Sequence, residues 1–284
     1  MKLHIWHETR YDYSAPLTYA LQSLCLTPQA SAHQTVFHWT LTAPGPLFAR
    51  HDGYGNLAHT WTLSTRARSG VVSAQGTVET HASSCLVDPF VPPQLYLRPT
   101  ALTTPDPALS ELGRVAAAAA GPDRDGAWAL TLAREILRRV PYRAQVTTVL
   151  TTAAEALALQ GGVCQDHAHI FVAACRAHGL PARYVSGYFH APDALHLASH
   201  AWADVCIDVP NGLWLSVDVT HACLMDERHV RLAVGPDYTA CAPIRGIREG
   251  GGEESMKVDI QIRQPLPPSS RQLQQAAPKH FAPA

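Results

Sequence analysis

The feature that most constrains the fold is a pair of alternating runs, SHAWADVCIDV at 199–209 and LWLSVDV at 213–219. Alternation with a period of two predicts two strands, and the Pro-Asn-Gly between them is a hairpin signal. In an antiparallel pair, the numbers of directly opposed residues have a constant sum. His200 and Asp218 lie on the same face only if that sum is even, and a sum of 420, for example, places Asp218 opposite Trp202. A two-residue Asn-Gly turn would pair Pro210 with Leu213, which is an odd sum. A shared face therefore predicts a longer loop or a bulge in this hairpin.

A cysteine stands at the predicted start of a helix in GGVCQDHAHIF, residues 161–171. A buried helical face is predicted by the small or apolar residues at i, i+3, i+4 and i+7, which are Ala168, Phe171, Val172 and Cys175. The helix should begin close to Cys164 and end at Gly179, before Pro181. A helix N-terminus favours negative charge and hence the thiolate, and the double glycine would allow a tight turn that exposes it. The alternative is that Cys164 is a small buried hydrophobe, as lone cysteines usually are.

The rest of the chain predicts an α+β protein in four parts. Residues 1–86 alternate short apolar runs with Gly and Pro breaks, as in a small β-sandwich or barrel. Residues 87–107 form a proline-rich linker, residues 108–264 a core with helices and strands, and residues 265–284 a polar tail predicted to be disordered. Helices are predicted over 108–120, over 126–140 with a buried stripe, and over 152–159, where Thr152 and Glu155 form a capping box. The stripe consists of Trp128, Leu132, Ile136 and Val140.

Composition limits the partners and the compartment. With a formal net charge of −1 over 284 residues, the chain has no bulk field that would favour nucleic acid or an anionic membrane. Its start lacks the uninterrupted apolar core of a secretory signal, and no stretch is long and apolar enough to span a membrane, so a cytoplasmic location is expected. The 7 cysteines show no paired short spacing and are expected to be reduced thiols.

Three motifs in one order resemble the core of the bacterial transglutaminase-like superfamily. They are GVCQDHAHIFVAACRAHGLPARYVSGY, then SHAWADV, then the run that begins GLWLSVDVTHACL. The resemblance covers roughly residues 108–264, and DGYGN at 52–56 resembles the β-rich domain that precedes this core in one bacterial branch. It implies a papain-like fold, with helices packed on an antiparallel sheet, behind a sandwich-like β-domain.

The resemblance also implies a thiol acyltransferase or hydrolase that needs no cofactor. Cys164 would be the nucleophile, His200 the general base and then acid, and Asp218 the carboxylate that orients His200. The substrate would be a peptide or a glutamine side-chain amide, converted through a thioester, and hydrolysis and transamidation both stay open. The Cys164 N–H is one candidate oxyanion donor and Tyr142 is a second, with packing beside Pro141 as its alternative role.

Two further residues are placed near the cleft, each with a structural alternative. His167 would lie one turn from Cys164 or serve as a surface or supporting histidine, and Trp202 would shield the His200 contact or belong to the core. The sequence departs from the family in two places. DVTH puts Val219 and His221 where relatives have proline and asparagine, and the loop at 190–200 looks short beside relatives.

The sequence offers two alternatives to an amide-cleaving enzyme. A metal site is disfavoured because the usual zinc spacings are missing, although the candidate ligands are numerous: Cys164, Asp166, His167, His169, His196 and His200. A transglutaminase-like core kept only as a binding or scaffold module is the second alternative. Asp166 is given a structural role, bonding first-turn amides or an arginine such as Arg183.

Overall fold

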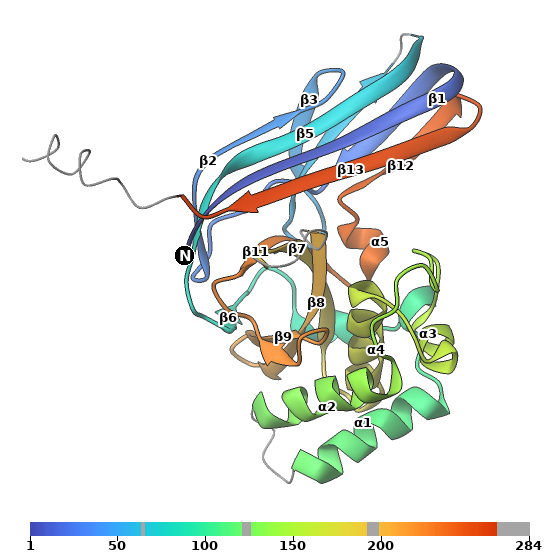
Figure 1. Ribbon diagram of the computed structural model, residues 1–284. Coiled ribbons are helices and arrows are strands. Elements are labelled where there is room, and N and C mark those ends of the chain that lie inside the picture. The colour runs from blue at the N-terminus through green and yellow to red at the C-terminus, as the bar shows by residue number, and fades with distance from the viewer. Residues whose placement is uncertain (64–65, 121–125, 192–198, 266–284) are drawn as a thin grey trace, which may run out of the picture.

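Two antiparallel sheets and a layer of helices make up the protein (Figure 1). The computed structural model describes residues 1–63, 66–120, 126–191 and 199–265. The predicted tail from residue 266 onward, most of the 190–200 loop and His196 lie outside the described residues. Within these ranges, no helix has the length and apolar character needed to cross a membrane.

The N-terminal sheet is organised around one very long strand. β1 (Lys2–Leu24) lies between β5 and β13 in its first half and between β4 and β12 in its second half, so that one continuous curled sheet replaces two separate layers. Apolar residues from both halves, such as Leu3, Leu17 and Trp61, share one core. The other strands are β2 (Gln34–Thr42), β3 (Leu47–His51), β4 (Leu57–Leu63), β5 (Ala67–Thr80), β12 (Ile244–Gly250) and β13 (Glu254–Arg263).

The end of the chain returns to the N-terminal sheet. β13 pairs with the first half of β1, from His4 opposite Arg263 to Tyr13 opposite Glu254, and β12 pairs with the second half. In Figure 1, β12 and β13 run alongside β1 although they come last in the chain. The division expected at residues 108–264 therefore does not follow sheet membership, since residues 244–263 belong to the first sheet. Pairing over such a separation leaves no local signal in the sequence.

The second sheet carries the helices on one face. Its path is β10-β9-β8-β7-β11, with β6 also paired to β9. The strands are β6 (Cys85–Val87), β7 (Ala182–Phe189), β8 (Ser199–Asp208), β9 (Leu213–Asp218), β10 (Cys223–Leu224) and β11 (His229–Gly235). The helices are α1 (Pro107–Ala120), α2 (Gly126–Arg139), α3 (Ala153–Leu159), α4 (Cys164–Ala177) and α5 (Tyr238–Cys241), with 3-10 turns at Pro93–Leu97 and Ala101–Thr103 in the predicted linker.

α4 is the central helix, since it contacts β7 and β8 on one side and α1, α2 and α3 on the other. The predicted face is buried, but so are Asp166, His167, His169 and Arg176, because neighbours surround the helix. The predicted stripe of α2 is buried in the same core, and the capping box between Thr152 and Glu155 is present at α3.

The hairpin of β8 and β9 has the register that a shared face requires. Ala203 lies opposite Val217, Asp204 opposite Ser216 and Cys206 opposite Trp214, each with the even sum of 420. The register shifts between Cys206 and Asp208, so the predicted bulge is present. The bulge changes the odd pairing favoured by the turn into the even pairing of the strands, as bulges do.

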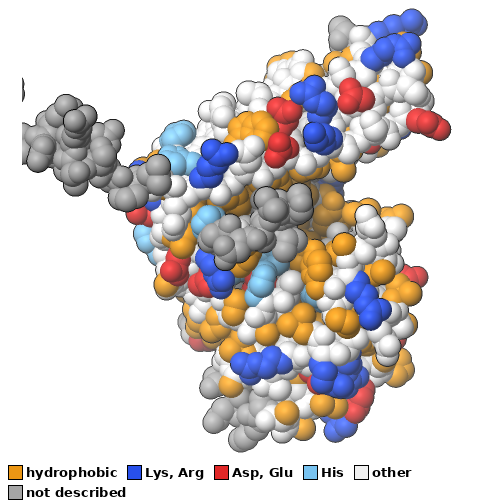
Figure 2. Space-filling view, in the orientation of Figure 1, with side chains coloured by type: hydrophobic (Ala, Val, Ile, Leu, Met, Phe, Trp, Pro, Cys, Tyr) orange, Lys and Arg blue, Asp and Glu red, His pale blue; other side chains and the backbone are white. Residues whose placement is uncertain are grey.

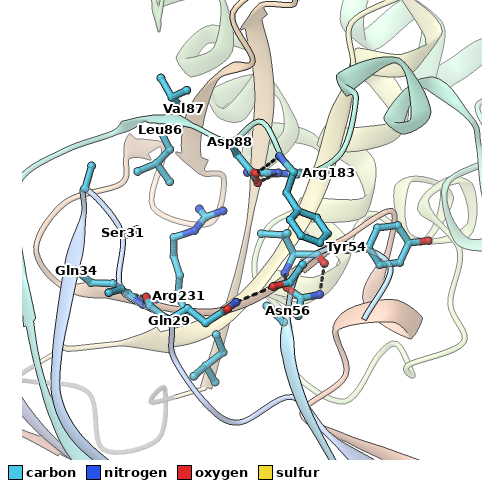
Figure 3. Close-up of a pocket in the computed structure, with 17 residues that line it drawn as sticks. Gln29, Ser31, Gln34, Tyr54, Asn56, Leu86, Val87, Asp88, Arg183 and Arg231 are labelled. Carbon is cyan, nitrogen blue, oxygen red and sulfur yellow. Dashed lines mark hydrogen bonds and ion pairs between the residues drawn. The ribbon is translucent and has the colours of Figure 1, made fainter. Parts of the chain in front are cut away.

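DGYGN attaches the N-terminal sheet to β11, the last strand of the second sheet (Figure 3). Asn56 Oδ1 accepts from the Val234 N–H at 2.7 Å, and Asn56 Nδ2 donates to the Val234 carbonyl at 2.7 Å. Gln34 makes the same two bonds with the backbone of Arg231, at 2.8 and 2.9 Å. Asp52 holds Asn56 in place by accepting from its backbone and side-chain N–H groups. Two side-chain amides thus act as the missing neighbour of an edge strand.

Candidate functional site

A buried carboxylate organises the loop that presents Cys164. α4 begins at Cys164, and Asp166 Oδ2 accepts from the Val163 N–H and the Thr147 hydroxyl, both at 2.7 Å. A Cβ on Gly162 would stand 2.7 Å from that same Oδ2. The role of Gly162 is therefore to make room for Asp166, and the left-handed residue of this turn is Gln160, at φ 50°.

The structural role predicted for Asp166 is present in one of its two forms. Asp166 bonds the start of the helix as expected, but Arg183 is engaged elsewhere, by Asp204 at 2.8 Å and Asp88 at 2.6 Å. Burial raises the pKa of Asp166, although its hydrogen bonds oppose this shift. The contact with Arg183 was a wrong expectation, because the arginine side chain lies over Tyr96 and Trp214 at the far end of β7.

Four strand ends meet at the edge of the second sheet where Cys164 lies. β9 ends at Asp218, β8 begins beside His200, β7 ends at Phe189 and β11 begins at His229. In an antiparallel sheet, the ends and starts of neighbouring strands alternate along one edge, so these residues come together. Phe189 packs against three imidazole rings there, with centroid distances of 5.2, 4.5 and 4.8 Å to His200, His221 and His229.

Cys164, His200 and Asp218 lie together at this edge, and His200 is hydrogen-bonded to Asp218. His200 Nε2 donates to Asp218 Oδ2 at 2.9 Å, which leaves Nδ1 as the ring nitrogen available to the Cys164 sulfur. Burial alone would lower the pKa of His200, but its hydrogen bonds to Asp218 and Cys164 outweigh burial and raise the pKa to about 10. The ring is therefore held in its protonated form beside a partly exposed thiol. A thiolate and imidazolium pair is the form that serves nucleophilic chemistry.

Asp218 accepts hydrogen bonds from three imidazoles on one oxygen. Besides His200, its Oδ2 receives His221 Nδ1 at 2.6 Å and His229 Nε2 at 2.9 Å. Burial would raise the pKa of Asp218, but these three bonds outweigh it and hold the pKa well below its ordinary value. Asp218 is fully buried, so its negative charge is compensated by neighbouring rings in place of water.

The network of hydrogen bonds continues beyond Asp218 to residues that were not predicted from the sequence. His229 Nδ1 lies 3.2 Å from Asp226 Oδ1, and Asp226 pairs in turn with Arg228 at 2.6 Å. Burial would lower the pKa of His229, but its bonds to Asp218 and Asp226 raise it. Asp226 and His229 were missed because β7 lies between β8 and β11 and separates β11 from the hairpin that the sequence revealed. Phe189, at the end of β7, was missed because no turn or spacing in the sequence shows that β7 pairs with β8.

The three residues predicted near the cleft have different surroundings. Tyr142 is half exposed and forms an isolated parallel β-bridge with Gly162. Burial raises the pKa of Tyr142, and the nearby Cys164 raises it further. His167 is fully buried: its Nε2 donates to the Val140 carbonyl at 2.8 Å and its Nδ1 faces the Thr220 hydroxyl at 3.0 Å. Burial lowers the pKa of His167 to about 4, so it is a neutral structural residue that lines no open surface.

Trp202 is fully buried and lies beside His200, with ring centroids 6.1 Å apart. The indole also lies over Gly187, where an added Cβ would stand 2.5 Å from the ring.

Hydrogen bonding accounts for the one set of metal-ligand atoms found together in the described residues. Ligand atoms of His200, Asp218 and His221 all lie within 4.8 Å of one another. Both imidazoles donate to the same Asp218 oxygen, which explains the cluster without an ion. His169, another of the weighed ligands, accepts from the Tyr238 N–H at 3.1 Å inside the core.

The seven cysteines are free thiols with contrasting environments. Burial raises the pKa of Cys25 and Cys223 to about 11 and that of Cys206 less far, and it holds the pKa of Cys175 and Cys241 well above the ordinary value. Cys85, at the start of β6, is exposed, and Cys164 and Cys223 are partly exposed. Because its raised pKa disfavours the thiolate of Cys223, Cys85 and Cys164 are the thiols that a labelling reagent should modify readily.

The fold and this site define a transglutaminase-like protein: a papain-like core in which a cysteine opens the central helix and a histidine and a carboxylate follow on adjacent strands. Residues 114–219 match the model of the transglutaminase-like superfamily, and residues 3–79 match the bacterial transglutaminase-like N-terminal region. The chain belongs to this bacterial transglutaminase-like family.

Relatives of similar length support the assignment. An uncharacterized protein of Mycobacterium leprae is 30% identical over 92% of this chain and 98% of its own length. An uncharacterized protein of Mycobacterium tuberculosis is 30% identical over 92% of this chain and 91% of its own length. A crystal structure from Cytophaga hutchinsonii, described as a candidate cysteine protease, matches with a TM-score of 0.72 at 20% identity, over 93% of this chain and 90% of that one.

Proposed function

We propose that the protein is a cysteine-dependent acyltransferase or hydrolase that acts on peptide or glutamine side-chain amides. The observation that carries the proposal is that His200 is hydrogen-bonded to Asp218 and lies beside Cys164, which stands in the first turn of α4. A binding module would have no need to hold an imidazole protonated beside a thiol that solvent can reach.

The proposed reaction has two stages. The Cys164 thiolate attacks the amide carbon, the C–N bond breaks, and His200 gives its proton to the departing amine or ammonia, which leaves a thioester. In the second stage His200 takes a proton from water or from an amine as that nucleophile attacks the thioester. The products are the free thiol and a carboxylic acid or a new amide.

First-turn amides are the proposed source of oxyanion stabilisation. The N–H groups of Cys164 and Gln165 have no acceptor within α4, because the first four N–H groups of a helix lack one. They can therefore donate to the oxygen that becomes negative during attack. Tyr142, near Cys164 and half exposed, is proposed as a further donor from its hydroxyl.

Selective alkylation tests the nucleophile. In a Cys85→Ser background, iodoacetamide at neutral pH is expected to label one cysteine rapidly, and Cys164→Ala should abolish that labelling. Asp218→Asn should slow it, because the carboxylate supports the protonated His200. Labelling that is equally slow at all cysteines would favour the scaffold alternative.

Mass spectrometry of a glutamine-containing peptide library distinguishes the reactions. A gain of about one dalton marks deamidation, an adduct with added amine marks transfer, and cleavage marks proteolysis. Cys164→Ala serves as the blank for each product. Absence of all three products at high enzyme concentration would contradict an amide substrate.

A further inference from the structure

A cavity of about 440 Å³ lies between the N-terminal sheet and the core. One wall is a single face of the β1 and β13 pair, where Ile260, Val258 and Met256 lie opposite His7, Thr9 and Tyr11. The other wall includes Ser199 and Tyr238. In Figure 2, hydrophobic side chains line the hollow between the sheet above and the core below. The volume falls within the range of ligand pockets.

The cavity lies close to the candidate active site. Ser199 is the residue before His200 at the start of β8, so their Cα atoms lie about 3.8 Å apart. Tyr238 packs in the same cluster as Cys164, Tyr184 and Ala201. A peptide rises about 3.3 Å per residue when extended, so a side chain in the cavity would lie within two or three residues of the reacting amide.

Most of the lining residues are apolar or aromatic, and His7, Thr9 and Ser199 are the uncharged polar ones. Met256 and Val258 are 60% and 46% exposed, which is unusual for such residues on the inward side of a strand. Asp259 is the one acidic residue in the lining, but it alternates with Val258 and so its side chain points to the opposite face. Burial lowers the pKa of His7 to about 4, and its two nitrogens face Tyr188 and Thr9, so it is neutral and satisfied.

We propose that this cavity binds an aliphatic or aromatic side chain of the peptide substrate, close to the amide that reacts. The inference rests on the proposed function and names the substrate class: an extended peptide with an apolar residue within three positions of the target. Acidic and basic side chains would be excluded, because the lining offers no counter-charge for them.

Fluorescein-labelled octapeptides provide the test. Each has one glutamine in a glycine and serine background, with leucine, phenylalanine, lysine or glutamate two residues before the glutamine. Anisotropy measures their binding to the Cys164→Ala protein. The leucine and phenylalanine peptides are expected to bind at least about tenfold more tightly than the charged ones.

Two matched variants locate the binding. Val258→Glu places a charge in the cavity and should remove the preference for apolar peptides. Ser255→Glu adds the same charge to the opposite face of β13 and should leave the preference intact. Equal affinity for all four peptides, or an equal effect of the two variants, would overturn the inference. So would a wild-type dimer that Val258→Glu converts to a monomer, because the cavity would then be a contact between copies.

Alkylation separates this inference from the proposed function. Ser255→Glu lies on the opposite face of β13 and outside the cavity, so it should leave the rate of Cys164 alkylation unchanged in the Cys85→Ser background. Normal alkylation with no peptide preference would refute the cavity and keep the nucleophile. Slow alkylation of Cys164 together with preferential binding of the apolar peptides would refute the nucleophile and keep the cavity.

Discussion

Gly162→Ala is expected to impair the presentation of Cys164. An added Cβ would stand 2.7 Å from Asp166 Oδ2 and 2.8 Å from Asp166 Cβ, whereas ordinary contacts begin at 3.4 Å. The carboxylate must therefore retreat by about 0.7 Å, which weakens its 2.7 Å bonds to the Val163 N–H and the Thr147 hydroxyl. Asp166 has little room to move because it is 1% exposed.

The expected size follows from the bonds that weaken. Loss of a cap interaction at a helix N-terminus costs about 1 to 2 kcal/mol of stability. A displacement of about 1 Å at a reacting group can lower a rate by about 100-fold. Gly162→Ala should thus lower the free energy of unfolding in urea by about 1 to 2 kcal/mol. In the Cys85→Ser background, it should slow alkylation of Cys164 by tenfold or more, since 1.4 kcal/mol corresponds to about tenfold.

Gly161→Ala is the matched control in the same dipeptide. Its added Cβ would stand 2.8 Å from Cδ of Arg143, and that long side chain can rotate away. The rate of Cys164 alkylation in Gly161→Ala should therefore lie within about twofold of the wild-type rate. If both glycines respond equally, or if Gly162→Ala behaves as wild type, the close approach of Asp166 does not govern how Cys164 is presented.

Three further perturbations test the attachment of the N-terminal sheet to β11, the buried histidines and the proton on His200. Asn56→Ala leaves the Val234 N–H and carbonyl unsatisfied and should lower the free energy of unfolding in urea by about 2 to 5 kcal/mol. Asn211→Ala on the exposed hairpin loop should lower it by less than about 0.5 kcal/mol. Equal effects of the two variants would contradict the role of Asn56 in joining the N-terminal sheet to β11. Burial lowers the pKa of His7, His167 and His169 to about 4, so the unfolded chain binds more protons below pH 6.5. The contribution of these neutral histidines to the free energy of unfolding is complete above pH 6.5 and is lost as the pH falls toward 4, by at most about 4 kcal/mol per pH unit. An equal free energy of unfolding near pH 7 and pH 5 would refute this prediction. Because the pKa of His200 is raised to about 10, the alkaline decline of kcat/KM should come only as the pH rises through about 10, and an alkaline decline near pH 7 would show that the imidazole is not held protonated.

Local patterns in the sequence were sufficient for the elements around Cys164 and His200. The start of α4, the capping box of α3 and the stripe of α2 each depend on residues within one short segment of the chain. The bulge in the β8–β9 hairpin could be predicted because an even register requires an extra residue somewhere between the strands.

Long-range pairings could not be predicted in the same way. β13 pairs with β1 from the other end of the chain, and its alternating pattern would suit either sheet. His229 meets Asp218 because β11 lies beside β7, a neighbour that no turn or spacing specifies. The glycines before Cys164 were interpreted as turn residues, but the close approach of Asp166 becomes visible only when a residue three positions inside the helix folds back.

The departure DVTH is explained by how Asp218 is satisfied. Val219 is buried in the core that α4 shares with the second sheet, so this position contributes packing. His221 takes the place of the expected asparagine and donates to Asp218 at 2.6 Å, while its ring stacks on Phe189 at 4.5 Å. An amide would keep the hydrogen bond but lose the aromatic stack. The carboxylate that orients His200 is therefore fixed from three directions, by β8, by β11 and by the turn after β9, and rotation of any one ring leaves two donors in place.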